Sequence, residues 1–429
     1  MPDFEPLHQE SDFIAEKIKE RPLNKKKLLR TSVITALSGV LFAVIASVTF
    51  LILIPLLSKR LNPEELPTIV EFPEEIDYEE IAPENMLVEE EPPVVSEPED
   101  IDDAHIEEVV MNMDWSLNDF RSMNDSVYRY AKDCQRSLVT VTGAISNTDW
   151  FNETYESKGA TSGLIFYDNT VDLLILVDRT NLSKAQTLSV TFYDGTKLEA
   201  FEKAYDPETN LSVIAVPLNT ISQDLRERIS IASLGSSNTV SGLSGTMVVA
   251  LGSPMGTEKS VCFGHITSDS GVISLADANY RLLTTDIYAS TKGSGVLMDT
   301  KGQVLGFLSN KQSPSDTPNL LTALGISELK KVITKLGNGG NVPYFGIVGT
   351  DVSDEVNETL GVPKGAFIKE IYMDSPAMLA GIQRGDVIVK MGGSEIDRFS
   401  TYTNFVMGIH EGDTVKITIM RQAQDEYKE

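Results

Sequence analysis

The sequence predicts a mainly β protein with two folded modules. Between about residues 121 and 315, short runs of β-branched and apolar residues are separated by turn signals, which is typical of an all-β barrel or sandwich. Residues 342–429 show a different pattern, in which short strands alternate with two short helices. The length of 429 residues exceeds one typical domain, so we expect two folded domains and additional segments.

The N-terminal part predicts a membrane anchor. Residues 31–58 contain no charged side chain, and this stretch is longer than the ~20 apolar residues that cross a bilayer. A cleaved signal peptide has a shorter apolar stretch that begins nearer the start of the chain. We therefore expect a cytoplasmic tail over residues 1–32 and a transmembrane helix over residues 33–58.

Flanking charge predicts the orientation of this helix. Four basic residues precede the span and two follow it: Lys25, Lys26, Lys27 and Arg30, then Lys59 and Arg60. Because basic residues are retained on the cytoplasmic side, the N-terminus is expected in the cytoplasm and the folded modules outside it. This single-pass topology fits the plasma membrane of a bacterium.

Residues 59–117 are expected to be an acidic, disordered stalk. Positions 61–120 contain twenty-one Asp or Glu and no Lys or Arg, and carry most of the net charge of −27. Such a segment, interrupted by prolines, buries too little apolar surface to offset its ordering entropy. The acidity also argues against binding to nucleic acid or to anionic lipid, which both require excess positive charge.

The folded part has recognisable element boundaries. Strands are expected at 138–141, 173–177, 188–192, 212–216, 247–251 and 304–308, with hairpin turns at 194–195 and 301–302. One helix is expected over 118–136. Another is expected from an N-cap at Ser327, with an apolar stripe of Leu329, Val332, Ile333 and Leu336, and a flexible hinge is expected at 337–341.

The C-terminal module has its own pattern. Its expected strands are 367–371, 386–390 and 415–420, and its expected helices are 375–379 and 401–409. Two cysteines, Cys134 and Cys262, are too few for a disulfide framework. The sequence leaves open whether they pair or remain buried thiols.

Five sequence blocks resemble one protease family. They are TSGLIF at 161–166, DPETNLSV at 206–213, ALGSPMG at 250–256, GHITS at 264–268 and TD at 285–286. In this order and spacing, and followed by the C-terminal module, they are similar to the HtrA/DegP family of trypsin-fold proteases with PDZ domains. The resemblance implies a two-barrel trypsin-like domain (chymotrypsin fold) over 118–337 and a PDZ domain over 342–429.

The positions of the family's catalytic triad are occupied by other residues here. Thr180 stands where the family has its histidine base, and Asn210 stands where it has the orienting aspartate. Ser294 aligns with the nucleophile, but its loop is one residue short and Lys292 replaces an oxyanion-hole glycine. Because a serine needs a neighbouring base, this pattern predicts a pseudoprotease with a degenerate triad.

No other residue supplies the missing base or a metal site. The chain has four histidines, at positions 8, 105, 265 and 410, and none falls in the segment where the family places its base. Lys292 lies in a polar loop that gives no sign of the desolvation a lysine base needs. We expect no cofactor, and no metal site, because His265 has no second ligand at metal spacing.

The C-terminal module retains the features of a peptide-binding groove. Tyr344, Phe345, Gly346 and Ile347 resemble the loop and strand edge that capture a peptide C-terminus. Their backbone N–H groups are expected to accept a carboxylate, and the following edge to pair with an added strand. Phe405 and Ile409 are expected either to line the side-chain pocket or to belong to the core.

Three hypotheses for function follow. The first is a membrane-anchored, inactive scaffold or sensor that binds protein C-termini or unfolded polypeptides. The second is a weak or conditional serine endopeptidase in protein quality control that uses Ser294, and the third is a structural protein of the cell envelope. The family resemblance implies a homotrimer or a mixed assembly with an active relative, formed near residues 128–130.

Overall fold

A computed structural model describes residues 37, 38, 49, 67–73, 116–148, 154–290, 292–309, 318–424 and 426–429. Leu66–Glu429 form one compact unit, which holds the folded modules. The expected transmembrane span lies outside the described residues except for 37, 38 and 49, which are helical. In the part of the chain that is described, no helix has the length and apolar character needed to cross a bilayer.

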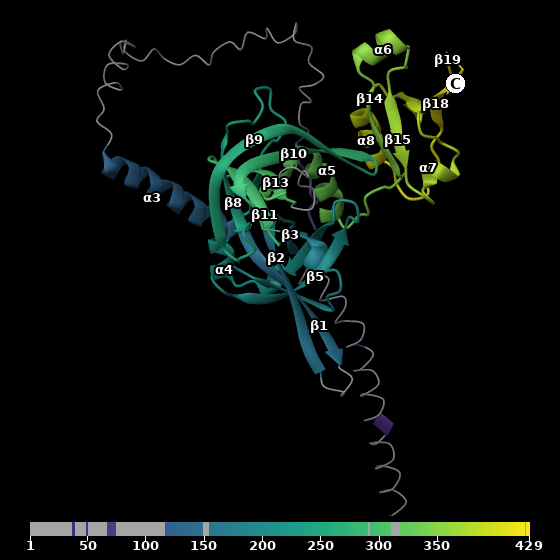
Figure 1. Ribbon diagram of the computed structural model, residues 1–429. Coiled ribbons are helices and arrows are strands. Elements are labelled where there is room, and N and C mark those ends of the chain that lie inside the picture. The colour runs from purple at the N-terminus through teal and green to yellow at the C-terminus, as the bar shows by residue number, and fades with distance from the viewer. Residues whose placement is uncertain are drawn as a thin grey trace, which may run out of the picture. The chain divides into compact units, whose positions relative to one another are not determined.

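The first module begins with a closed antiparallel barrel (Figure 1). Its strands follow one another in the order β1-β2-β3-β6-β5-β4: β1 (Leu138–Thr148), β2 (Thr154–Asp168), β3 (Asp172–Asp178), β4 (Thr187–Thr191), β5 (Lys197–Tyr205) and β6 (Leu211–Pro217). The interior is filled by branched aliphatic side chains such as Val141, Ile175 and Ile214, none of which is exposed. The predicted turn at Gly195 joins β4 to β5 with a positive φ of 92°.

A second sheet, antiparallel except for the short parallel pair of β7 and β12, also closes on itself, because β11 pairs with both β8 and β12. Its strands are β7 (Ser233–Leu234), β8 (Met247–Ser253), β9 (Ser260–Leu275), β10 (Ala278–Tyr288), β11 (Ser294–Asp299), β12 (Gln303–Leu308) and β13 (Leu320–Gly325). The strands β9 and β10 form a long hairpin (Figure 1). The expected two-barrel architecture is therefore confirmed.

Helices flank the barrels. They are α3 (Leu117–Cys134), η3 (Gln135–Ser137), η4 (Arg179–Asn181), η5 (Leu218–Thr220), α4 (Gln223–Arg228) and α5 (Ile326–Gly337). The predicted helix before β1 is confirmed as α3, which begins with a capping box between Ser116 and Asp119. The apolar stripe predicted for α5 is also confirmed, because Leu329, Val332 and Leu336 are fully buried.

The start and end of α5 differ from the expectation. Ser327 is the second residue of the helix, and its Oγ accepts the N–H of Ser237 at 2.9 Å. The cap comes from a distant loop, since the Ser237 hydroxyl accepts the Ser327 N–H at 3.0 Å. The expected hinge at 337–341 begins inside the helix, and the N–H groups of Gly339 and Gly340 bond to the last carbonyls of α5.

Part of the expected stalk packs against the barrels. In the segment 67–73, Val70 is only 1% exposed and belongs to the core between the barrels. Its N–H donates to Asn338 Oδ1 at 2.8 Å, and Asn338 Nδ2 donates to its carbonyl at 2.9 Å. Apart from this segment and residues 116–117, the expected stalk lies outside the described residues.

The C-terminal module is a small sheet in the order β14-β15-β16-β18-β19, with β17 paired to β16. Its elements are β14 (Ile347–Asp351), α6 (Asp354–Leu360), β15 (Ala366–Ile371), α7 (Pro376–Leu379), β16 (Val387–Met391), β17 (Ser394–Glu395), α8 (Phe399–Met407), β18 (Ile417–Ala423) and β19 (Glu426–Lys428). A separate core forms here around Ile368, Ile388 and Tyr402. All the strands and helices predicted for this module are present within a few residues.

The two cysteines do not pair. Cys134 and Cys262 are both free and half-buried, and burial raises the pKa of each thiol. This outcome is the second of the two alternatives that the sequence leaves open.

Shortening Val70 is expected to destabilise the compact unit 66–429. Val70→Ala removes two buried methyl groups and leaves a gap beside Gly337, so the free energy of unfolding should fall by about 2 kcal/mol. Urea unfolding followed by far-UV circular dichroism measures the change. The neighbouring Ile69 is 74% exposed, so Ile69→Ala should change it by less than about 0.5 kcal/mol. Equal effects of the two substitutions would contradict the packing of this segment.

Candidate functional site

Two of the three predicted triad positions lie in contact. Thr180 lies on η4 after β3, and Asn210 precedes β6 with a φ of 60°, which asparagine tolerates. The turn before Asn210 is fixed by the Asp206 carboxylate, which accepts the N–H and the hydroxyl of Thr209 at 2.9 and 2.6 Å. As a result, Asn210 Nδ2 lies 2.7 Å from Thr180 Oγ1.

Both side chains are bonded to a neighbouring aspartate. Asp178 Oδ1 accepts the Thr180 N–H at 2.7 Å and Asn210 Nδ2 at 2.6 Å, and it also accepts the Thr180 hydroxyl. Neither a hydroxyl nor a carboxamide takes up a proton near neutral pH. This pair therefore lacks the chemistry of a base held by a carboxylate.

An ion pair next to this cluster fixes η4. Arg179 Nε lies 2.7 Å from Glu202 Oε1, and its guanidinium lies 4.1 Å from the centre of the Tyr205 ring. The hydrogen bond that Arg179 donates to Glu202 raises the pKa of Arg179, so this cation stays charged. The same Glu202 oxygen accepts the Ser212 hydroxyl at 2.8 Å, which links η4 to β6.

Ser294, the third position, is bonded elsewhere. It is the first residue of β11, it is only 6% exposed, and its Oγ accepts the Ser162 N–H from β2 at 3.0 Å. The packing around it is tight, because a Cβ on Gly295 would lie 2.0 Å from the Leu251 carbonyl oxygen. Among the described residues, its hydroxyl makes no hydrogen bond to Thr180 or Asn210.

The loop before Ser294 uses its own N–H groups. The Lys292 N–H donates to Ser290 Oγ at 3.3 Å, and the Gly293 N–H donates to the Ser290 carbonyl at 2.8 Å. An oxyanion hole needs N–H groups that point toward the reacting carbonyl. The Lys292 N–H instead closes a turn within the loop.

The described histidines lie apart from this cluster. His265 Nδ1 lies 3.2 Å from Asp286 Oδ2 across the β9–β10 hairpin, and His410 is exposed in the C-terminal module. His8 and His105 are outside the described residues. In the part of the chain that is described, no group of three metal-ligating side chains is found.

The predicted carboxylate loop of the C-terminal module holds a carboxylate of the first module. The N–H groups of Phe345, Gly346 and Ile347 converge on Asp277, with shortest distances of 2.6, 2.8 and 3.1 Å to its Oδ atoms. Gly346 has a φ of 91°, and a Cβ there would lie 2.4 Å from the Cβ of Ser375. Only glycine fits this close approach.

Helix α8 completes the cradle of Asp277. The buried Tyr402 hydroxyl donates to Asp277 Oδ1 at 2.5 Å, and the Thr403 hydroxyl donates to the Asp277 carbonyl at 2.8 Å. Burial, followed by the Asp277 charge, raises the pKa of Tyr402, so this group remains a donor. Asp277 is 5% exposed, and these bonds compensate the desolvation of its charge.

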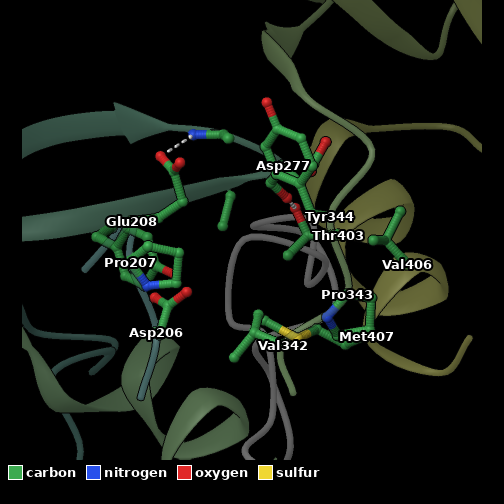
Figure 2. Close-up of a pocket in the computed structure, with 13 residues that line it drawn as sticks. Asp206, Pro207, Glu208, Asp277, Val342, Pro343, Tyr344, Thr403, Val406 and Met407 are labelled. Carbon is green, nitrogen blue, oxygen red and sulfur yellow. Dashed lines mark hydrogen bonds between the residues drawn. The ribbon is translucent and has the colours of Figure 1, made fainter. Parts of the chain in front are cut away.

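A cavity of about 200 Å³ adjoins this contact (Figure 2). Its acidic lining residues are Asp206, Glu208 and Asp277. Burial, together with repulsion by Asp206 and Asp277, raises the pKa of Glu208. The α8 residues in its lining are Thr403, Val406 and Met407.

Phe405 and Ile409 lie against the core of the C-terminal module and are partly buried. The Phe405 ring packs on Gly392, where an added Cβ would lie 2.7 Å from it. Neither residue lines the cavity. Their packing matches the core alternative.

Sequence reasoning missed Asp277 and Tyr402. Asp277 occupies a two-residue turn between Leu275 and Ala278, so its local sequence indicates only a hairpin turn. Its partners lie about seventy to 125 residues further along the chain.

Comparisons with known proteins agree with this architecture. The family model of the trypsin-like peptidase domain matches residues 161–307, and that of the PDZ domain matches residues 343–427. The chain is 26% identical over 334 residues to "Serine protease Do-like HtrA" of Bacillus subtilis, covering 71% of this chain and 72% of that protein. It is 28% identical over 275 residues to a "Probable periplasmic serine endoprotease DegP-like" of Pseudomonas putida, covering 63% of this chain and 55% of that protein.

A solved structure supports the fold. The "HtrA-type protease AlgWS227A with decapeptide" has a TM-score of 0.50 and 19% identity, covering 70% of this chain and 94% of that chain. Together, the two domain matches show a trypsin-like peptidase domain followed by a PDZ domain, and the chain is similar over most of its length to HtrA- and DegP-like serine proteases.

Proposed function

We propose that this chain is a catalytically inactive HtrA-type pseudoprotease that binds polypeptide C-termini through its PDZ domain. The observation that carries the proposal is the bonding of the three triad positions. Ser294 Oγ is buried and accepts a backbone N–H, while Thr180 and Asn210 are bonded to Asp178. With no base beside it, a serine hydroxyl is a poor nucleophile, and the loss of triad members lowers the rate by several powers of ten.

The proposed setting is the bacterial cell envelope. The uncharged stretch within 31–58 supports a single transmembrane helix with a cytoplasmic N-terminus. The acidic segment that follows then serves as a spacer, with residues 67–73 fixed against the barrels. The P. putida relative is named as periplasmic, which agrees with this placement.

Self-association through α3 is part of the proposal. Leu117, Phe120 and Met123 are three apart on α3 and are 57–65% exposed, so this helix presents apolar surface. Tyr130, in contrast, donates its hydroxyl to the Asp299 carbonyl of the same chain. Tyr128 is also 60% exposed, so a homotrimer or a mixed assembly with an active relative would use the exposed apolar side of α3 up to the predicted segment at 128–130.

The second candidate function is that of a serine endopeptidase. The names of the relatives favour it, because several are called serine proteases. In this case Ser294 would have to leave Ser162 and meet a base that comes from elsewhere.

Casein digestion separates these two functions. We expect the full chain and Ser294→Ala to release no peptides from unfolded casein above the buffer blank, with trypsin as the positive control. Ser294→Ala should still lower the free energy of unfolding by about 1–3 kcal/mol, because the buried Ser162 N–H loses its acceptor. Peptide release that depends on Ser294 would refute the inactive protein and support the endopeptidase.

Peptide binding by the PDZ domain has a separate test. The probe is a pool of fluorescein-labelled nonapeptides with random internal sequence and an apolar last residue, and fluorescence anisotropy measures its binding to the full chain. The free-acid pool should bind at least about tenfold more tightly than the C-terminally amidated pool, since the loop N–H groups accept an anion.

Gly346→Ala should abolish this preference, because its Cβ would clash with Ser375. Gly393→Ala is the matched control, since Gly393 has a φ of 94° but no atom within 4 Å of its added Cβ. Equal binding of acid and amide by the full chain would contradict carboxylate recognition.

A further inference from the structure

We infer that Asp277 is an internal ligand of the PDZ domain, so that a polypeptide C-terminus binds only by displacing the tip of the β9–β10 hairpin. This inference rests on the proposed peptide-binding function. It adds a competing ligand from the barrel domain, which lowers the affinity of the PDZ groove for a free peptide.

The side chain of Asp277 occupies the position of a terminal carboxylate. Both of its oxygens accept N–H groups from the loop at Phe345, Gly346 and Ile347, at 2.6–3.1 Å. A peptide C-terminus is captured by backbone N–H groups of this kind. Because these donors are already bonded to one carboxylate, a second carboxylate has no place among them.

The Asp277 backbone and the Asn279 side chain also bond to the edge of β14 that a bound peptide would use. The Asp277 N–H donates to the Ile347 carbonyl at 2.8 Å, and Asn279 Nδ2 donates to the Gly349 carbonyl at 3.2 Å. These two carbonyls are two residues apart and therefore lie on the same edge of β14. An added peptide strand needs this same edge.

The side of the groove opposite β14 also contacts the hairpin tip. Tyr402 and Thr403 of α8 donate to the side chain and the carbonyl of Asp277, respectively. The hairpin tip thus contacts the loop, β14 and α8, which are the three elements that would hold a peptide. Figure 2 shows Asp277 beside Tyr344 and Thr403 at the cavity.

The internal contact carries features that favour its exchange. Asn279 Oδ1 is buried and has no hydrogen-bond partner among the described residues, and an unsatisfied buried acceptor is unfavourable. Glu208 is a second acid near Asp277, and its Oε2 accepts the Ala276 N–H at 3.4 Å. A ligand with a full set of partners and no neighbouring like charge would bind better than this tip.

The expected ligand is an extended polypeptide with a free terminal carboxylate. It would take over the N–H groups of residues 345–347 and the edge of β14, and the hairpin tip would leave the groove. Peptide binding and contact between the barrel and the PDZ domain are then mutually exclusive states. A peptide therefore binds only after the internal contact has opened. Because only a small fraction of molecules is open, the apparent affinity for the peptide is lower than its affinity for the open state.

Removal of the Asp277 carboxylate tests this competition. With the full chain and the free-acid nonapeptide pool, Asp277→Ala and Asp277→Asn should bind at least about tenfold more tightly than wild type, because the open state is commonly a minor one. Binding of the amidated pool should not gain. Glu208→Gln is the matched control: it removes a negative charge from the same cavity but leaves Asp277 in the loop, and should change the affinity less than threefold.

The possible results are distinct. Unchanged affinity in both Asp277 variants, with the wild type binding the free-acid pool, would overturn the internal ligand and leave the proposed peptide binding intact. An equal gain in Glu208→Gln would also overturn it, because relief of negative charge would then explain the effect. Lack of binding by every variant would refute peptide binding itself, and with it the competition.

Hydrogen exchange tests the contact without any peptide. In wild type, the amides of residues 345–347 should be protected, since Asp277 accepts all three. Asp277→Ala should speed their exchange at least about tenfold, whereas the amides of β16 should keep their rates, which shows that the module remains folded. Unchanged exchange at residues 345–347 would overturn the inference.

Discussion

Three backbone N–H groups that point to one spot require an anion, and the arrangement around the PDZ loop follows from this constraint. Gly346 has no side chain, so the loop can turn its N–H groups inward. The only compensation for three converging, desolvated donors is an acceptor with several lone pairs, which a carboxylate provides. Asp277 supplies it from the tip of a hairpin whose strands β9 and β10 belong to the barrel. This one contact holds the tip of a barrel hairpin against the PDZ loop and α8.

The hydrogen bonds made by the three triad positions can be explained in the same way. In a working triad, the serine hydroxyl and the base must be free to exchange a proton. Here the polar groups are occupied by structural bonds: Asp178 binds the two residues at the histidine and aspartate positions, and Ser294 accepts a strand N–H. These bonds occupy the polar groups at all three positions, which is the basis of the proposed non-catalytic function.

Local sequence patterns predict most of the fold. They do not predict contacts between residues that lie far apart in the chain. The apolar stripe of α5, the turn at Gly195 and the short helix after Ser375 depend on neighbours within a few residues, and all were predicted. The cap of α5 was wrong because Ser237, ninety residues away, supplies the hydroxyl in place of Ser327. Val70 was placed in a disordered stalk because its acidic neighbours dominate the composition, although Asn338 holds it in the core. The resemblance places Thr180 and Asn210 at two triad positions, and their hydrogen bond follows from the fold, whereas none of the family blocks contains Asp277.

Together, the proposals assign the barrel domain a regulatory role that does not require catalysis. The hairpin presents its carboxylate at a fixed position, so it loses little conformational entropy when it binds to the groove. It can therefore occupy the groove with few contacts. A free polypeptide must make more contacts to compete, and it gains them along the edge of β14. In this proposal the barrel acts as a threshold that admits only ligands with both a terminal carboxylate and an extended segment that pairs with β14. Binding of a peptide excludes binding of the hairpin tip, so a bound peptide would separate the barrel from the PDZ domain. A sensor requires such a coupling between ligand binding and a change of state.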